Sequence, residues 1–209
     1  MDGKGLEVDN TSLSDILRII FQPILLPVAR FLGRLGLTPN MLSIIGMGAY
    51  VFAALLLAAG HPYGCALVLG VFGPLDVLDG TLARDSGQES DYGAFLDATL
   101  DRYEEFFIYA GLLYYLLEVL GKGAITAVLV LSALSGSFFV SYTRAKAEAL
   151  GFECSVGILT RFERIVLFIV AIITGWYDAI LAVIAALSFV TTFQRMAVVA
   201  KQARGHEGK

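Results

Sequence analysis

The chain has 209 residues, of which 57% are hydrophobic and 16% are charged, and its mean hydropathy is +0.74. Because a soluble domain carries about a quarter charged residues, this composition argues against a soluble enzyme and favours an integral membrane protein. The net charge of −4 is unevenly distributed, and no nucleic-acid partner is expected. Cys65 and Cys154 lie far apart, which argues against a zinc site and against a disulfide framework.

The first predicted element is an amphipathic helix within residues 10–37. Its apolar residues Leu13, Ile16, Leu17 and Ile20 recur at helical spacing. Two prolines would interrupt a membrane span in this segment, and the arginines between residues 18 and 34 would be costly inside one. We therefore expect a juxtamembrane helix that lies in the membrane interface.

Six membrane spans are predicted in residues 38–200, because a spanning helix needs about 20 mostly apolar residues. The third span begins with a charged face, which lowers its hydropathy. The spans are Met41–Gly60, Tyr63–Ala83, Ala94–Leu117, Gly123–Tyr142, Gly157–Tyr177 and Ala179–Ala200. The sequence therefore predicts an all-α integral membrane protein with a single domain over residues 1–209, of which residues 201–209 form a polar tail.

The basic residues predict how these spans are oriented. With six spans, both termini, the loop around Arg84 and the loop within residues 144–164 lie on one side of the membrane. Of the 15 Lys and Arg residues, only Lys122 then lies on the other side. Basic residues collect on the cytoplasmic face. We therefore expect a multi-pass protein of the cytoplasmic membrane, with both termini and the Arg84 loop in the cytoplasm.

Four carboxylates are predicted to meet where the second and third spans face each other. Asp76 and Asp79 are three residues apart and share one helix face. Gly93, Asp97 and Asp101 form a second stripe at intervals of four residues. Four like charges need compensation in a low dielectric. Two divalent cations would balance them, and oxygen ligands suit Mg²⁺, Mn²⁺ or Ca²⁺.

The residues around the carboxylates favour a phosphate ligand. Gly80, Ala83 and Gly93 leave room beside the acids, and Arg84 offers a guanidinium to phosphate oxygens. Paired metal ions can clamp the attacking and leaving oxygens of a phosphoryl displacement. Structural ion pairs, a proton path or an acid-lined cation transporter are the alternatives. A transporter usually keeps its acids nearer the membrane midplane.

The stretch "DVLDGTLARDSGQESDYGAFLDATLD" resembles the signature of the CDP-alcohol phosphotransferase family. The signature is Asp-x-x-Asp-Gly-x-x-Ala-Arg, eight residues, then Gly-x-x-x-Asp-x-x-x-Asp, and every specified position is filled here. The resemblance implies a dimeric membrane enzyme with two Mg²⁺ or Mn²⁺ ions. Such an enzyme transfers a phosphatidyl-type group from a CDP-lipid to an alcohol and releases CMP. A membrane prenyltransferase also uses carboxylates and Mg²⁺ but lacks the Asp-Gly-x-x-Ala-Arg run.

The same resemblance implies roles for individual residues. Asp101 is the expected general base. The expected metal ligands are Asp76, Asp79, Asp97 and Asp101. The expected contacts of the CDP-lipid are Thr38, Pro39, Asn40, Gly80, Ala83, Arg84, Ser90 and Gly93. For "TPN" at residues 38–40, a simple helix start is an equally good interpretation.

A second charged segment, "SYTRAKAEALGFECSVGILTRFER", is the candidate site for the acceptor alcohol. Arg161 and Arg164 are three residues apart and can point at one anion, whereas Arg144 and Lys146 diverge on a regular helix. Glu148, four residues after Arg144, could hold that arginine in place. Arginines bind phosphate well, although anchoring at the cytoplasmic face is the alternative.

This segment resembles the phosphatidylinositol phosphate and archaetidylinositol phosphate synthase branch of the family. That branch has a Ser-Tyr-x-basic-Ala-basic-Ala-Glu run and a later Arg-x-x-Arg, and it uses inositol 1-phosphate. Here Arg144 precedes Lys146, the reverse of the order in the bacterial enzymes. Glycerol 3-phosphate is the alternative acceptor. Glu105 continues the carboxylate stripe one turn deeper, where it contacts either a sugar hydroxyl or a buried basic residue.

Overall fold

A computed structural model describes residues 25–154 and 156–207 of the chain. The described residues form helices and contain no strand, which confirms the all-α class. A short helix covers residues 25–34 and is called the 25–34 helix below. The others are α2 (Pro39–Ala58), α3 (Pro62–Phe72), α4 (Leu75–Ser86), α5 (Asp91–Tyr114), η1 (Tyr115–Val119), α6 (Ala124–Ala149), α7 (Arg161–Thr174) and α8 (Tyr177–Glu207). The amphipathic pattern at Leu13 to Ile20 lies outside the described residues.

The second predicted span is interrupted in the structure. Helix α3 ends at Phe72 and α4 begins at Leu75, so Gly73 and Pro74 separate the two. Proline has no backbone N–H and its ring clashes with the preceding helical turn, which explains a break at this position. The carboxylate-bearing half of the span is therefore a helix of its own.

Four stretches of the described chain are long and apolar enough to cross a membrane. They are Pro39–Ala58, Pro62–Ser86, Ala124–Ala149 and Tyr177–Arg204. Helix α7, with 14 residues, is shorter than a typical span. Helix α5 has the length, but acidic residues occupy its first half. The structure thus supports a membrane protein, while the count of six spans stays a prediction.

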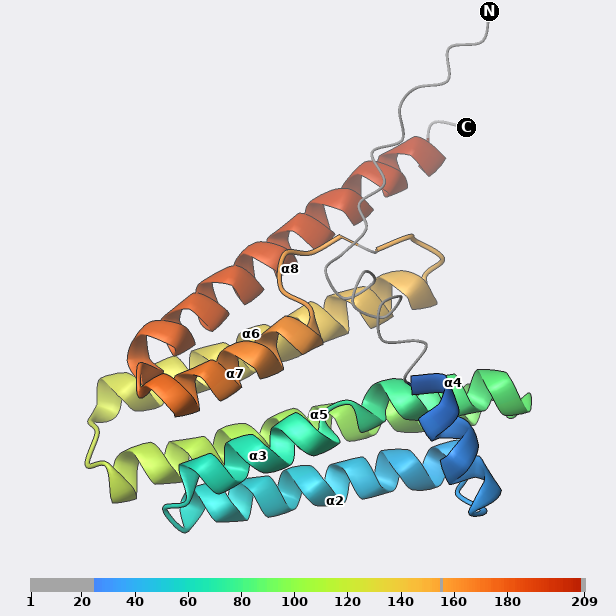
Figure 1. Cartoon of the computed structure of the whole chain (residues 1–209). Helices are drawn as coiled ribbons and strands as arrows, with labels where there is room; N and C mark the ends of the chain where they lie inside the picture. Colours follow the sequence, from blue (N-terminus) through green and yellow to red (C-terminus); the bar gives the residue numbers. More distant parts are fainter. Residues whose placement is uncertain (1–24, 155, 208–209) are drawn as a thin grey trace, which may run out of the picture.

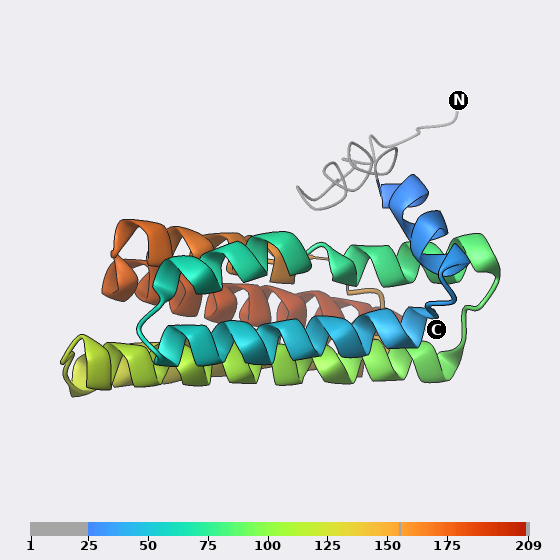
Figure 2. The same ribbon diagram turned by 60° about the horizontal axis from the view of Figure 1, so that its bottom comes forward.

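The helices form two groups that lie against each other (Figures 1 and 2). Helices α2 to α5 form one group, in which α2 packs against α3, α4 and α5, and α6 to α8 form the other, in which α6 packs closely against α8. Contacts of α3 with α7 and of α5 with α6 join the groups. The main core lies between them and includes Leu57, Leu112, Leu116, Leu181 and Ile184.

Lys122 lies at the end of the bundle opposite α4. Three chain connections meet at this end, after α2, after η1 and after α7 (Figure 2). The Lys122 ammonium forms an ion pair of 2.6 Å with Asp178, and Thr126 donates a hydrogen bond of 2.7 Å to the same carboxylate. Lys122, which the predicted topology sets apart from the other Lys and Arg residues, is thus tied to an acid at the start of α8.

Candidate active site

Helix α4 contributes a buried carboxylate to the candidate site. Asp79 is 5% exposed, and the Ser43 hydroxyl of α2 donates a hydrogen bond of 2.5 Å to its Oδ2. Asp76 lies one turn earlier on the same helix, but its side chain is outside the described part of the structure. Ser43, which the sequence analysis did not single out, therefore fixes the orientation of Asp79.

Helix α5 contributes the second stripe of carboxylates. Asp97 and Asp101 are both half-buried and one turn apart. The Arg161 guanidinium of α7 contacts Asp101 at 2.5 Å, and Arg102 contacts the other oxygen of that carboxylate at 3.3 Å. The structure thus brings the carboxylate motif of α5 into direct contact with the basic segment that was predicted to bind the acceptor.

The residues present fit a divalent metal by the chemistry of their donor atoms. The candidate ligands on α4 and α5 are all carboxylate oxygens, which Mg²⁺ and Mn²⁺ prefer. Among the side chains that the structure describes, a set that excludes Asp76, no three acidic, His or Cys groups lie close enough to hold a metal. The predicted four-carboxylate cluster is therefore untested.

Side chains of the same region lie close to the two glycines of the motif. A Cβ added to Gly80 would lie 3.4 Å from the Arg84 guanidinium, so this exposed arginine folds back over the glycine. A Cβ added to Gly93 would lie 3.3 Å from the Asn40 side chain of α2. Ala83 is half-buried on α4 between these positions in the motif. A substituent at either glycine would narrow the space beside the motif.

The remaining predicted nucleotide contacts are helix caps in the structure. The Thr38 hydroxyl accepts a hydrogen bond of 3.3 Å from the Met41 amide, and Pro39 is the first residue of α2. The Ser90 hydroxyl accepts one of 3.0 Å from the Gly93 amide and caps α5. Thr38 and Ser90 therefore explain where α2 and α5 begin, and contact with a nucleotide is a further prediction for both.

The two basic residues of α6 are exposed at its C-terminal end. Arg144 is paired with Glu148 at 2.8 Å, as its spacing predicted, and both side chains are more than half exposed. Lys146 is exposed as well, and the intervening Ala147 is buried. Both cations are therefore accessible at the surface.

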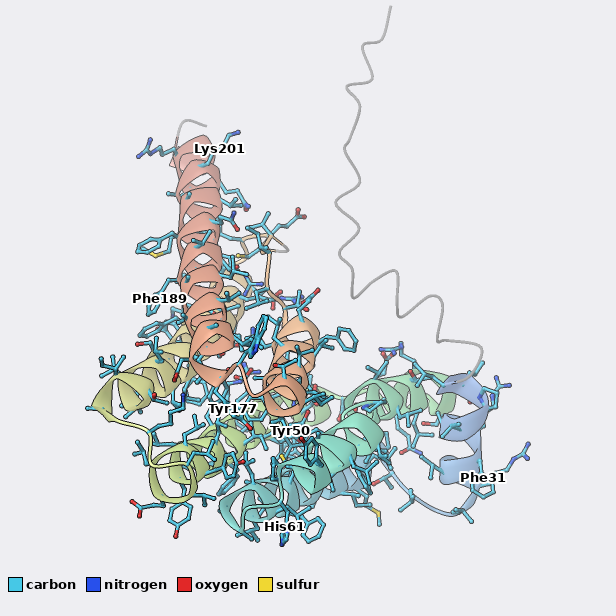
Figure 3. The ribbon with its side chains drawn as sticks, turned by 60° about the vertical axis from the view of Figure 1, so that its left-hand side comes forward. Phe31, Tyr50, His61, Tyr177, Phe189 and Lys201 are labelled. Atoms are coloured by element: carbon cyan, nitrogen blue, oxygen red, sulfur yellow. The ribbon has the colours of Figure 1, made fainter. Side chains whose placement is uncertain are left out.

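The two arginines of α7 are held tightly by carboxylates of α5. Arg161 contacts both Asp101 and Glu104, and its guanidinium lies 6.0 Å from the ring centroid of Tyr50, which Figure 3 labels on α2. Arg164 is 4% exposed and contacts Glu105 through both Nε and Nη2. Glu105 thus pairs with a buried basic residue, which is one of the two alternatives that the sequence left open. Arg161 and Arg164 bind different carboxylates rather than one common anion.

Arg195 is a buried cation that the sequence analysis used only in its count of basic residues. It lies on α8, is 4% exposed, and donates hydrogen bonds to the carbonyl oxygens of Val140 on α6 and Val156 in the following loop. An arginine within an apolar span is a signal in itself, because intramembrane charges are costly. That signal could have singled out Arg195, whereas its partners on α6 and in the loop after α6 are known only from the structure.

The chain is similar to known proteins in both sequence and structure. A family model described as CDP-alcohol phosphatidyltransferase matches residues 36–194. Archaetidylinositol phosphate synthase of Methanothermobacter thermautotrophicus is 34% identical over 197 residues, which cover 91% of this chain and 95% of that protein. A crystal structure of Mycobacterium tuberculosis phosphatidylinositol phosphate synthase with CDP-DAG bound matches with a TM-score of 0.78 and 32% identity, over 85% of this chain and 94% of that one. A structure of the same enzyme with manganese and citrate has a TM-score of 0.76 at 32% identity, over 84% and 88% of the two chains.

Proposed function

Because the chain belongs to the CDP-alcohol phosphatidyltransferase family, we propose that it transfers a phosphatidyl-type group from a CDP-lipid to inositol 1-phosphate. The reaction releases CMP. The observation that carries this proposal is the contact of Asp101 with Arg161, because it joins the motif for the donor to the basic segment for the acceptor. Family membership also favours a transferase over the cation transporter and the prenyltransferase.

The donor would bind at the facing ends of α4 and α5. Asp76, Asp79, Asp97 and Asp101 would hold two Mg²⁺ or Mn²⁺ ions, a proposal that the manganese in a relative's structure supports. When bound, such ions neutralise the charge that develops on the diphosphate during the displacement. Arg84 and Gly80 would contact the CDP diphosphate, with Thr38, Pro39, Asn40, Ala83, Ser90 and Gly93 around the nucleotide.

The chemical step needs a base for the acceptor hydroxyl. The Asp101 carboxylate would accept that proton, while the acceptor oxygen forms a bond to the β-phosphorus of the CDP-lipid. The bond from this phosphorus to the oxygen of CMP breaks, and CMP leaves with the electron pair. Arg161 orients the Asp101 carboxylate through the ion pair, and a general base contributes roughly 10²–10⁴-fold in rate.

The acceptor would be held by the basic residues of α6 and α7. Arg161 is the best placed of them, since it already touches Asp101. Arg144 and Lys146 are exposed and would contribute to binding the phosphate, while the buried pairing of Arg164 with Glu105 supports an indirect role in positioning. Glycerol 3-phosphate, which carries the same kind of phosphate, is the alternative acceptor.

The proposed setting is a six-span homodimer in the cytoplasmic membrane. Both termini and the site would face the cytoplasm, and the segment within residues 10–37 would lie in the membrane interface. The positions of Arg84, Arg144 and Arg161 at one end of the bundle, with Lys122 at the other, support this orientation.

The proposal is tested by measuring CMP release from a CDP-lipid in detergent or vesicles. Asp101→Asn should lower the rate by about 10²–10⁴-fold, and EDTA should silence the wild type until Mg²⁺ or Mn²⁺ is restored. Asp91→Asn, on the exposed first turn of the same helix, is the matched control. Inositol 1-phosphate, glycerol 3-phosphate, inositol and serine should be offered in parallel. Full activity of Asp101→Asn, or metal-independent release, would contradict the assignment.

A further inference from the structure

Helix α4 carries half of the proposed donor site, and its position depends on its neighbours as well as on the chain. The Gly73–Pro74 break separates it from α3. At its other end Gly87, with φ of +64°, stops the helix in a left-handed turn before the loop to α5. Among the numbered helices of the described chain, α4 packs mainly against α2. Contacts of its side chains with neighbouring helices therefore contribute to its placement.

The 25–34 helix supplies a second set of these contacts. In Figures 1 and 2 it is the dark blue helix beside α4. Ala29 of this helix joins Leu42 of α2 and Leu78 and Leu82 of α4 in a small buried cluster apart from the main core. A Cβ added to Gly33 would lie only 2.9 Å from the Leu82 side chain. The glycine therefore allows the two helices to approach closely.

An ion pair joins the same two helices. Arg30 binds Asp85 in a two-pronged arrangement, with Nε 3.1 and 3.0 Å from the two carboxylate oxygens and Nη2 2.7 Å from Oδ1. Asp85 directly follows Arg84, which is the predicted diphosphate contact. Two parallel hydrogen bonds fix the relative orientation of the guanidinium and the carboxylate, whereas a single hydrogen bond would leave them free to rotate. Phe31, the next residue, points away from the bundle and is 60% exposed (Figure 3).

We propose that the 25–34 helix acts as a clamp on α4, with Arg30 and Asp85 as positioning residues for the donor half of the site. This inference rests on the proposed function. The clamp holds the last turn of α4, and through it Arg84, at the distance from α5 that the CDP-lipid requires. Ser43 of α2 holds Asp79 on the same helix in a similar way. Loss of the clamp lets the end of α4 move without unfolding the bundle, because the main core lies elsewhere.

Kinetics with separate donor and acceptor titrations test the clamp. Arg30→Ala and Asp85→Asn should each raise the KM for CDP-lipid by about three- to tenfold, because an exposed but two-pronged pair has a modest effect. The KM for inositol 1-phosphate should stay within about twofold of wild type. The charge-reversed double variant Arg30→Asp with Asp85→Arg should recover most of the donor affinity. Arg34→Ala, an exposed arginine on the same helix, is the control.

A second arm perturbs the clamp without removing a charge. Gly33→Val should push the 25–34 helix off Leu82 and raise the donor KM in the same way, with a thermal unfolding curve in detergent close to that of wild type. Equal donor KM values in wild type, Arg30→Ala and Gly33→Val would overturn the clamp. So would an equal effect of Arg34→Ala, or a loss of the folded fraction with unchanged KM values. Wild-type protein that releases no CMP would instead contradict the proposed function.

Discussion

Two pairs of basic residues flank the carboxylate motif, and they differ in how the fold holds them. Arg161 and Arg164 on α7 are mostly buried and bind carboxylates of α5, whereas Arg144 and Lys146 on α6 are exposed. All four lie within residues 144–164. The difference shows that the fold buries one pair among carboxylates and leaves the other pair at the surface.

The two pairs should also respond differently to substitution. If a buried arginine is replaced by an uncharged residue, its partner carboxylate remains in a low dielectric, where a charge without compensation is destabilising. An exposed arginine that is removed leaves a carboxylate in water, which solvates it well. The free energy of unfolding therefore tests mainly the arginines of α7. The KM for the acceptor tests the residues that contact its phosphate.

The largest expected effect is on Arg164. Arg164→Ala should lower the free energy of unfolding by about 3 kcal/mol, the lower end of the range for a broken buried ion pair, because buried Glu105 would keep only Arg102, at 3.6 Å, as a cationic partner. Thermal or denaturant unfolding in detergent measures this. The double variant Arg164→Met with Glu105→Leu should recover most of the loss, since an apolar pair needs no compensation. A loss well under 1 kcal/mol for Arg164→Ala would show that the pair is open to water.

Arg161 should have the next largest effect, and on the acceptor. Arg161→Ala should raise the KM for inositol 1-phosphate by roughly ten- to a hundredfold, because a charge-assisted hydrogen bond to phosphate contributes about 1.5–3 kcal/mol. The KM for CDP-lipid should change little. Glu104→Gln is the matched control, because it removes a partner of Arg161 but keeps the cation. If unphosphorylated inositol is used equally well, or if the acceptor KM is unchanged, Arg161 has a structural role alone.

Arg144 should show the smallest effect. Arg144→Ala breaks an exposed pair with Glu148 at i, i+4, so the free energy of unfolding should change by less than about 0.5 kcal/mol. If Arg144 reaches the phosphate, the acceptor KM should still rise, by roughly three- to tenfold. Glu148→Gln separates the ion pair from phosphate binding, because it breaks the pair but keeps Arg144. An Arg144→Ala variant with wild-type kinetics would assign Arg144 to anchoring at the membrane face.

The sequence alone determined the all-α class of the protein and the family to which its carboxylate motif belongs. The charge-free apolar runs predict membrane helices because only helices and closed β-barrels satisfy the backbone in lipid, and runs of about 20 apolar residues have the length of a spanning helix. The spacing of Asp97 and Asp101 places both on one face of α5, because helical geometry depends only on position along the chain. The pairing of Arg144 with Glu148 follows from the same local rule.

Only the tertiary structure decided which groups from different helices meet. Arg161 with Asp101, Arg164 with Glu105, and Arg30 with Asp85 join residues far apart in sequence, and no local spacing predicts their partners. The break at Gly73–Pro74 was visible as a dipeptide, yet whether a span continues through a proline depends on what packs around it. Helical period specifies which residues share a face, while the packing of whole helices specifies what that face touches.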